Sequence, residues 1–377
     1  MEKLNTKLTI EEAMKLALNL AKKGLGFVEP NPAVGCVILN TDEKLIGYGY
    51  HEKFGEPHAE VNALMSVRDK EELKGARVIV TLEPCGHSGK TPPCSEALIK
   101  AGIGTLVYGV SDPNPLFDHS GLADLKKNSI SVKKFNSSDE ILKKLSSLVE
   151  RFIFSQKKER AFVSLKIASS LDGQIALKNK KSKWITGDKS REHSHLLRAT
   201  HDATLIGVGT LIDDDPSLDI RLERLKHKKN KVIIFDPNFR SEQIIKQSKL
   251  MKSIGTENIF IASTKKSEVI NSSLRHIEVS LHNSGNIVLN VFTKTLLEFG
   301  IKSVLVEGGA GTTSEFLKQN AFDRIYAFIA PSIIGAGYGL SWSKDLQCED
   351  LDRKIKLSSP EIELFGDDIL LSYTPNN

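Results

Sequence analysis

The stretch VIVTLEPCGHSGKTPPCSEALIKA, residues 78–101, decides the fold of the first part of the chain. Residues 78–82 are mostly apolar and β-branched, which is typical of a buried strand, and residues 94–101 have the pattern of a helix. The two cysteines stand at the end of that strand and at the start of that helix, with a polar loop between them. The stretch therefore predicts a strand–loop–helix unit with two thiols at element ends.

Further strands and helices alternate on both sides of this unit. A capping box of Thr9 and Glu12 predicts a helix that ends at Gly24. Strands are expected at 33–39, 45–50 and 106–110, and helices at 58–67 and 138–158, the last one capped by Ser138. This alternation favours a layered α/β sheet. The polar residues 155–160 mark the boundary between two predicted domains, 1–155 and 160–377.

The second domain repeats the alternation. Strands are predicted near 162–168, 203–208, 231–235, 258–262, 303–307, 324–330 and 368–373, and helices near 188–199, 291–299 and 311–319. The charged stretch 222–230 is expected to be a surface loop. His193, His195 and His201 lie on a polar helix, where we expect them to be solvated.

Composition limits the classes of protein that the chain can belong to. With 377 residues, 40% of them hydrophobic and 26% charged, it has the composition of a globular protein with two domains. The absence of a long apolar run or an N-terminal signal sequence predicts a cytosolic protein without a membrane span. The net charge of +5 is scattered, which favours anionic small molecules over nucleic acid as partners, and a homo-oligomer is compatible with the sequence.

His58, Cys85 and Cys94 form a predicted zinc site. Two thiolates and one imidazole are the usual zinc ligands, and three protein ligands leave the fourth position open for a water molecule. The metal lowers the pKa of that water from about 15.7 to about 7. Glu60, two residues after the histidine, is then placed to accept its proton and return it to a leaving amine, as in zinc deaminases.

Two simpler interpretations of these residues are less favoured. A structural zinc needs a fourth protein ligand, and only His87 is near in the sequence. A pair of buried cysteines beside a surface histidine does not explain why all three residues stand at element ends.

Several motifs together resemble the bifunctional riboflavin deaminase/reductase family. They are Asn31-Pro32-Ala33-Val34-Gly35, Gly55-Glu56-Pro57-His58-Ala59-Glu60, Thr81 to Cys94, and Asp112-Pro113-Asn114-Pro115. The resemblance implies a cytidine-deaminase-like three-layer domain with Asn31, His87 and Lys90 as substrate contacts. Gly86, residues 116–121 and Asp236-Pro237 differ from the family's usual residues.

The second half resembles the reductase half of the same family, which has a dihydrofolate-reductase-like fold. The motifs are Ser164 to Gly173, Trp184-Ile185-Thr186-Gly187, Gly207-Val208-Gly209-Thr210, Asp214 to Arg221 and Glu307 to Ser314. The resemblance implies NADPH contacts from Ala168, Trp184, Thr210, Asp214, Gly309, Ala310, Gly311, Thr312, Thr313 and Ser314. It implies substrate contacts from Ser182, Arg198, Leu218, Arg221 and Glu307.

The resemblance implies a zinc-dependent deamination followed by an NADPH-dependent reduction in riboflavin biosynthesis, with one zinc ion per chain. NADPH in place of NADH rests on the resemblance, because no single residue decides it. Two other functions are weighed. A nucleic-acid deaminase would have a basic N-terminal half and a short Cys-x-x-Cys, which are absent. A deaminase joined to a non-catalytic nucleotide-binding module stays open from the residues alone.

Overall fold

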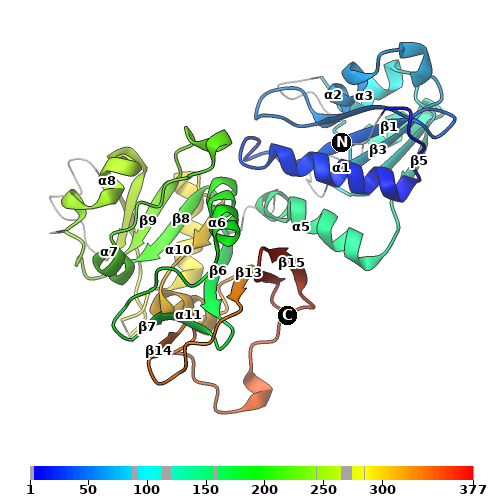
Figure 1. Cartoon of the computed structure of the whole chain (residues 1–377). Helices are drawn as coiled ribbons and strands as arrows, with labels where there is room; N and C mark the ends of the chain where they lie inside the picture. The colour runs from blue at the N-terminus through cyan, green and yellow to red at the C-terminus, as the bar shows by residue number, and fades with distance from the viewer. Residues whose placement is uncertain are drawn as a thin grey trace. The chain divides into compact units, whose positions relative to one another are not determined.

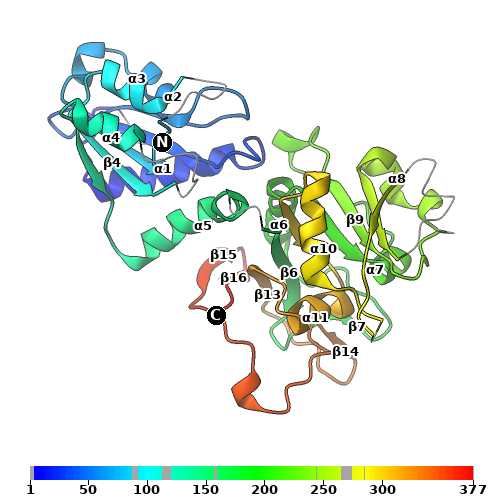
Figure 2. The same cartoon turned by 180° about the vertical axis from the view of Figure 1, so that it is seen from behind.

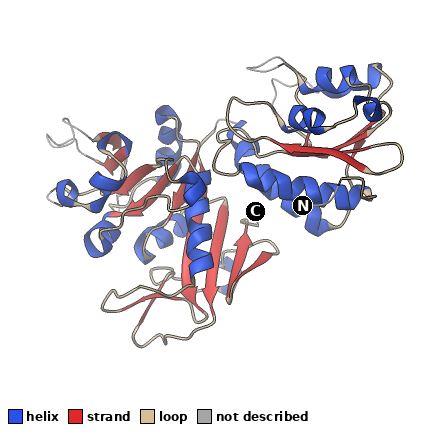
Figure 3. Ribbon diagram, turned by 45° about the horizontal axis from the view of Figure 1, so that its top comes forward, coloured by secondary structure: helices blue, strands red, loops and turns tan. Residues whose placement is uncertain are grey.

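The computed structural model describes residues 4–86, 92–112, 120–156, 159–242, 244–264, 274–283 and 285–376. The chain divides into two compact units, Met1–Lys157 and Lys158–Asn377. Each unit has its own sheet with helices packed against it (Figure 3). Among the described residues, no helix is both long and apolar enough to cross a membrane.

The first unit is built on a five-stranded sheet with the order β2-β1-β3-β4-β5. Its strands are β1 (Gly35–Leu39), β2 (Leu45–Tyr50), β3 (Arg77–Leu82), β4 (Thr105–Val110) and β5 (Ser131–Lys134), and its helices are α1 (Ile10–Gly24), α2 (Ala59–Ser66), α3 (Cys94–Lys100), α4 (Ser120–Lys127) and α5 (Asp139–Gln156). Strand β1 pairs antiparallel with β2 and β3, whereas β3, β4 and β5 run parallel. The carboxyl ends of β3 and β4 therefore lie at one edge of the sheet.

Alternating side chains divide this unit into three layers. On β1, Cys36 and Ile38 belong to the core shared with α2, α3 and α4, whereas Val37 and Leu39 face the core shared with α1. Figure 1 shows α1 lying along β1 and β3. Thr9 and Glu12 form both hydrogen bonds of the predicted capping box at the start of α1. The expected three-layer α/β arrangement is confirmed.

The second unit has a nine-stranded sheet with the order β11-β10-β9-β8-β12-β6-β13-β16-β15. Its strands are β6 (Phe162–Ser170), β8 (Ala203–Gly207), β9 (Lys231–Phe235), β10 (Ile259–Ser263), β11 (Arg275–Glu278), β12 (Ser303–Val306), β13 (Arg324–Ala330), β15 (Glu361–Phe365) and β16 (Asp368–Tyr373), with β7 (Gln174–Leu177) and β14 (Gly339–Ser341) in a small separate sheet. The strands from β11 to β13 are parallel, and β16 and β15 are antiparallel.

Helices cover both faces of this larger sheet. They are α6 (Asp188–Thr200), α7 (Val208–Asp214), α8 (Lys249–Ser253), α10 (Leu289–Thr295) and α11 (Ala310–Lys318). Phe292 of α10 and Phe316 of α11 pack on one face, which is turned toward the viewer in Figure 2. Leu197 of α6 and Leu250 of α8 pack on the other face. The carboxyl ends of the parallel strands are therefore framed by helices, which is where open α/β sheets bind ligands.

Two local expectations about this unit need correction. The stretch 222–230 contains a short 3-10 helix, Glu223–Leu225, and it buries Leu222 and Leu225 in spite of its charge. The strand expected over 203–208 ends at Gly207, because Val208 is already the first residue of α7.

Candidate active sites

The three predicted zinc ligands come together in the first unit. His58 stands immediately before α2, Cys85 follows β3, and Cys94 is the first residue of α3. The His58 Nδ1 atom lies 3.3 Å from Cys94 Sγ and 3.7 Å from Cys85 Sγ. Of the described residues, these three form the group of His, Cys and acidic side chains that could hold a metal ion, with ligand atoms within 4.8 Å of one another.

These distances fit a zinc ion. Bonds of about 2.1 Å to nitrogen and about 2.3 Å to sulfur place tetrahedral ligands roughly 3.6–3.8 Å apart. The Cys94 backbone N–H also donates to Cys85 Sγ over 3.3 Å. The hydrogen bond from the Cys94 thiol, with help from His58, holds the pKa of Cys85 well below its ordinary value. Both the geometry and the charge of the cluster therefore suit a divalent cation with an open fourth position.

Glu60 lies beside the cluster in the first turn of α2. Its side chain is 3% exposed. Burial, followed by the nearby Cys85 thiolate, raises the pKa of Glu60 to about 7. A carboxyl group with a pKa near neutrality can both accept and return a proton, which is the property that general acid–base catalysis needs.

His51 is a buried residue at this site that the sequence motifs did not reveal. Its ring packs edge-on against the His58 ring, with centroids 5.3 Å apart. His51 Nδ1 donates to the Pro57 carbonyl over 3.1 Å, which leaves Nε2 facing the Asn31 amide nitrogen at 3.5 Å. His51 thus links Asn31 to the residue that precedes the zinc ligand. In the sequence, the only indication of this role was that His51 directly follows the predicted strand 45–50.

The structure accounts for one departure from the family pattern. A Cβ atom at Gly86 would lie 2.2 Å from the backbone nitrogen of Gly121, so the chain after Cys85 and the start of α4 approach too closely for a side chain. His87 and Lys90, two predicted substrate contacts, lie outside the described residues.

A cavity of about 1180 Å³ opens at the carboxyl ends of the parallel strands in the second unit. The predicted residues that line it are Ala168, Ser182, Trp184, Arg198, Thr210, Asp214, Leu218, Arg221, Glu307, Gly309, Ala310, Gly311, Thr312 and Thr313. Ser314 is not among the lining residues. Its hydroxyl is buried and has no hydrogen-bond partner in the described part of the chain.

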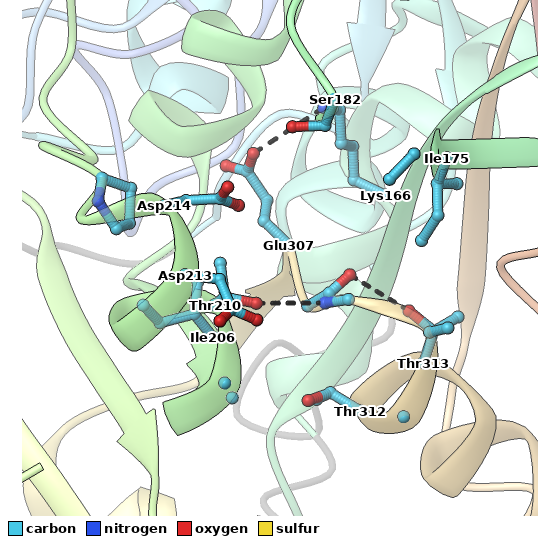
Figure 4. A pocket seen from close by; sticks show the side chains of 18 of the residues that line it. Lys166, Ile175, Ser182, Ile206, Thr210, Asp213, Asp214, Glu307, Thr312 and Thr313 are labelled. Atoms are coloured by element: carbon cyan, nitrogen blue, oxygen red, sulfur yellow. Dashed lines mark hydrogen bonds and ion pairs between the residues drawn. The ribbon is translucent and has the colours of Figure 1, made fainter. Parts of the chain in front are cut away.

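The starts of α7 and α11 meet at this cavity and fit a pyrophosphate. Thr210 Oγ1 accepts a hydrogen bond from the Gly309 backbone over 3.3 Å, as drawn in Figure 4. A Cβ atom at Gly207 or Gly308 would come within 2.5 Å of the Thr312 side chain. These glycines therefore let two helix starts, with their unpaired backbone N–H groups, approach each other closely. The cavity has the size and the donors for a dinucleotide.

A buried charge cluster also lines the cavity. Glu307 pairs with Arg198 through bonds of 2.5 and 3.0 Å. It also lies 3.8 Å from Lys166 Nζ, as Figure 4 shows. Burial alone would raise the pKa of Glu307, but Arg198 and then Lys166 lower it to about 2. Burial lowers the pKa of Lys166. Lys166 is a second residue that the sequence motifs did not single out, because it sits inside an apolar strand.

His195 also belongs to this cluster, so the expectation that it is solvated is wrong. Its Nδ1 lies 3.1 Å from the Asp219 carbonyl and 3.4 Å from Arg198 Nη1, and the ring lines the cavity. His201 is buried and bonded to Ser164 over 2.8 Å, and His193 packs against Phe365. Polar helix faces in this unit therefore point into the cavity or the core as well as to solvent.

The remaining predicted contacts stand nearer the rim of the cavity. Trp184 is 67% exposed, with the Arg191 guanidinium 4.4 Å from its ring centre. Burial raises the pKa of Asp214, and Arg221 is paired with Asp219 at 3.1 Å.

Family models match both units. The model described as "Cytidine and deoxycytidylate deaminase zinc-binding region" matches residues 8–110, and "RibD C-terminal domain" matches residues 161–371. The riboflavin biosynthesis protein RibD of Aquifex aeolicus is 37% identical over 360 residues, which cover 96% of this chain and 97% of that protein. The RibD of Escherichia coli is 33% identical over 337 residues, with coverage of 86% and 89%.

Solved structures agree with these matches. The diaminohydroxyphosphoribosylaminopyrimidine deaminase/5-amino-6-(5-phosphoribosylamino)uracil reductase of Thermotoga maritima superposes with a TM-score of 0.78 and 34% identity, covering 97% of this chain and 99% of that one. A RibD of Acinetobacter baumannii gives a TM-score of 0.78 and 32% identity, with coverage of 98% and 99%.

Proposed function

The chain belongs to the RibD family of bifunctional riboflavin biosynthesis enzymes, and from this membership we propose which part of it performs each reaction. Residues 1–155 hydrolyse the ring amine of 2,5-diamino-6-(5-phosphoribosylamino)pyrimidin-4(3H)-one and give 5-amino-6-(5-phosphoribosylamino)uracil. Residues 160–377 then reduce the ribosyl side chain to ribityl. When bound, zinc supplies a Lewis acid for the water that hydrolysis consumes, and NADPH supplies the two electrons for reduction.

In the deaminase half, His58, Cys85 and Cys94 hold the zinc ion and Glu60 carries the protons. Glu60 takes a proton from the water and delivers it to the leaving amine, a task that suits a carboxyl group with a pKa of about 7. The observation that carries this assignment is the convergence of the three ligand atoms within 4.8 Å. Asn31 binds the pyrimidine, and His51 holds the Asn31 side chain in place. His87 and Lys90 are the proposed contacts to the phosphoribosyl group of the substrate.

In the reductase half, the cavity binds both NADPH and the ribose phosphate. The residues that would hold the cofactor are Ala168, Trp184, Thr210, Asp214, Gly309, Ala310, Gly311, Thr312 and Thr313, with the buried Ser314 behind them in α11. The substrate lies against Ser182, Arg198, Leu218, Arg221 and Glu307. An arginine pairs with phosphate through two parallel hydrogen bonds, which suits the more exposed Arg221 to the phosphoribosyl end. Arg198 donates both Nε and Nη2 to Glu307, so its proposed role is to hold that carboxylate beside the substrate.

Lys166 is the proposed proton donor of the reduction. Reduction at C1′ breaks the bond to the ring oxygen of the ribosyl group, so that oxygen must gain a proton. Lys166 is a buried cation in the lining of the cavity, and Glu307 lies 3.8 Å from its Nζ atom. Burial and, to a smaller extent, the neighbouring Arg198 favour release of that proton, because they lower the pKa of Lys166.

The alternative of a non-catalytic C-terminal module is not favoured. Relatives that are reductases match over nearly the full length of the chain, and the buried Lys166–Glu307–Arg198 cluster gives the cavity charged groups suited to chemistry. We also propose that the enzyme works in the cytoplasm, where the thiols of Cys85 and Cys94 stay reduced.

The test is a coupled assay on the purified full chain. Wild type is given the diaminopyrimidinone ribotide and NADPH, and absorbance at the cofactor band is followed. We expect Glu60→Ala to consume NADPH only when it is given the deaminated uracil compound, and Glu56→Ala, a change at a nearby exposed acid, to behave as wild type. A wild type that consumes no NADPH even with the uracil compound would overturn the reductase assignment.

A further inference from the structure

One face of α6 lines the cavity in the second unit. Its residues follow one another at the spacing of a helix face, and they are Arg191, Ser194, His195 and Arg198. Three of these side chains are occupied within the protein, because Arg191 and Arg198 form ion pairs and the Ser194 hydroxyl donates to a backbone carbonyl. His195 differs from them, since only one of its two ring nitrogens is used in this way.

The nitrogen in use is Nδ1, which is held by the backbone. Nδ1 of His195 lies 3.1 Å from the Asp219 carbonyl oxygen, and its other contacts, to Arg198 Nη1 and the Arg221 backbone nitrogen, are longer at 3.4 Å. A carbonyl oxygen can only accept a hydrogen bond, so Nδ1 carries the ring proton and donates it. Arg198 Nη1 donates to the same carbonyl over 3.2 Å. One backbone acceptor therefore fixes both side chains.

The second ring nitrogen, Nε2, remains for a ligand. The His195 ring lines the cavity, and no residue in the described part of the chain forms a hydrogen bond with Nε2. Burial, followed by the charge of Arg198, lowers the pKa of His195, so the ring is neutral at neutral pH. A neutral ring that donates from Nδ1 can only accept at Nε2. His195 therefore favours a ligand group that has a proton to donate.

The contacts of His195 place it between the groups proposed for the two ends of the sugar phosphate. Arg221, the proposed phosphate contact, has its backbone nitrogen 3.4 Å from the ring. Arg198 joins the ring to Glu307, which lies beside Lys166, the proposed proton donor to the ribosyl ring oxygen. The part of the substrate between these ends carries hydroxyl groups. A hydroxyl can donate to Nε2, whereas the phosphate dianion has only acceptor oxygens.

We propose that Nε2 of His195 accepts a hydrogen bond from a ribosyl hydroxyl, at C2′ or C3′, and thereby makes the reductase specific for a hydroxylated sugar. This inference rests on the proposed reductase function and adds a specificity-determining residue to it. The nearby carboxylates already have partners, because Glu307 pairs with Arg198 and Asp219 pairs with Arg221. A site that bonds a substrate hydroxyl discriminates against an analogue without it, since the acceptor is then left unpaired.

The experiment measures kcat/KM of the full chain for NADPH oxidation with 5-amino-6-(5-phosphoribosylamino)uracil, its 2′-deoxy analogue and its 3′-deoxy analogue. His195→Asn keeps a donor for the Asp219 carbonyl but has no group at the position of Nε2. It should lower kcat/KM with the ribosyl compound about 3- to 10-fold, the loss expected for one neutral hydrogen bond. With the analogue that lacks the bonded hydroxyl, it should match wild type within about 2-fold, because no bond is lost. That analogue identifies the hydroxyl.

Two further variants separate a substrate contact from a structural role. His195→Gln, whose amide oxygen can reach the position of Nε2, should restore part of the preference for the ribosyl compound. His227→Asn, at an exposed histidine that is not among the residues lining the cavity, is the control and should behave as wild type. The affinity of both His195 variants for NADPH should stay within about 2-fold of wild type, which would show that the cavity is intact.

The pattern across the three compounds decides the outcome. A His195→Asn variant that loses activity equally with all three compounds, or with none of them, would overturn the hydroxyl contact. A wild type that oxidises no NADPH with the ribosyl compound would instead overturn the proposed reductase function, and this inference with it.

Discussion

Glu307 and Arg198 are 109 residues apart in the chain and are joined by two hydrogen bonds, from Nε to Oε1 at 2.5 Å and from Nη2 to Oε2 at 3.0 Å. The two side chains are only 8% and 15% exposed, and Lys166 lies on the same carboxylate at 3.8 Å. One buried negative charge thus holds two buried cations at the edge of the cavity. We therefore expect removal of the Glu307 charge to lower both the stability of the second unit and the rate of reduction.

Glu307→Gln should destabilise the second unit by about 3–5 kcal/mol, because it leaves two buried cations without their partner. Urea denaturation of the full chain measures this change. Glu363→Gln, at an exposed acid on β15, is the control and should alter stability by less than about 0.5 kcal/mol. An unchanged unfolding midpoint in Glu307→Gln would mean that water already solvates the cluster.

The same pair predicts how stability depends on pH. The pKa of Glu307 is about 2 in the folded protein, below its ordinary value of 4.5. Its contribution is therefore fully present above pH 4.5 and is lost as the pH falls toward 2. Between these values wild type should lose stability more steeply than Glu307→Gln, as measured by unfolding midpoints at a series of pH values. Parallel curves would contradict the assignment of the pair.

Lys166→Met should reduce the turnover of the reductase by about 10²- to 10⁴-fold, the usual range for loss of a general acid. Methionine keeps the length of the side chain but cannot donate a proton. Deaminase activity and NADPH affinity should stay near wild type. Lys178→Met, at an exposed lysine, is the matched control. A reductase turnover within about 3-fold of wild type would remove Lys166 from the mechanism.

Cys85→Ser should bind zinc poorly and lose deaminase activity by roughly 100-fold or more, since loss of a direct ligand exceeds the effect of losing a neighbouring residue. Zinc content after dialysis and deaminase rate are the measurements. NADPH affinity should not change. Cys348→Ser, at an exposed cysteine, should retain zinc and both activities. Full zinc content in Cys85→Ser would exclude Cys85 from the ligand set.

His51→Phe should lower the deaminase kcat/KM by about 5-fold while leaving the zinc content unchanged, because the loss of one hydrogen bond to Pro57 corresponds to roughly 1 kcal/mol. His51→Asn can restore the donor to the Pro57 carbonyl, and His51→Gln can restore the acceptor toward Asn31. The variant that recovers more activity identifies the contact that matters. If all three variants lose zinc, the role of His51 is instead to stabilise the metal site.

The sequence by itself determined the local structure and the zinc ligands. The capping box at Thr9 and the alternation on β1 depend on residues that are close in sequence, so their patterns predict the elements directly. His58, Cys85 and Cys94 are recognisable because a metal demands particular residue types at element ends. The motifs around these residues, together with those of the reductase half, were sufficient to identify the family to which the chain belongs.

Only the tertiary structure decided which other polar residues belong to the sites. Lys166 lies in an apolar strand and His195 lies on a polar helix, and nothing in their local sequence distinguishes them from core or solvated residues. Their roles depend on a carboxylate, a carbonyl or a cavity contributed by residues 24 to 141 positions away or by several strands at once. Such neighbours are fixed by the order of strands in the sheet, a long-range property that the local pattern of residue types does not contain.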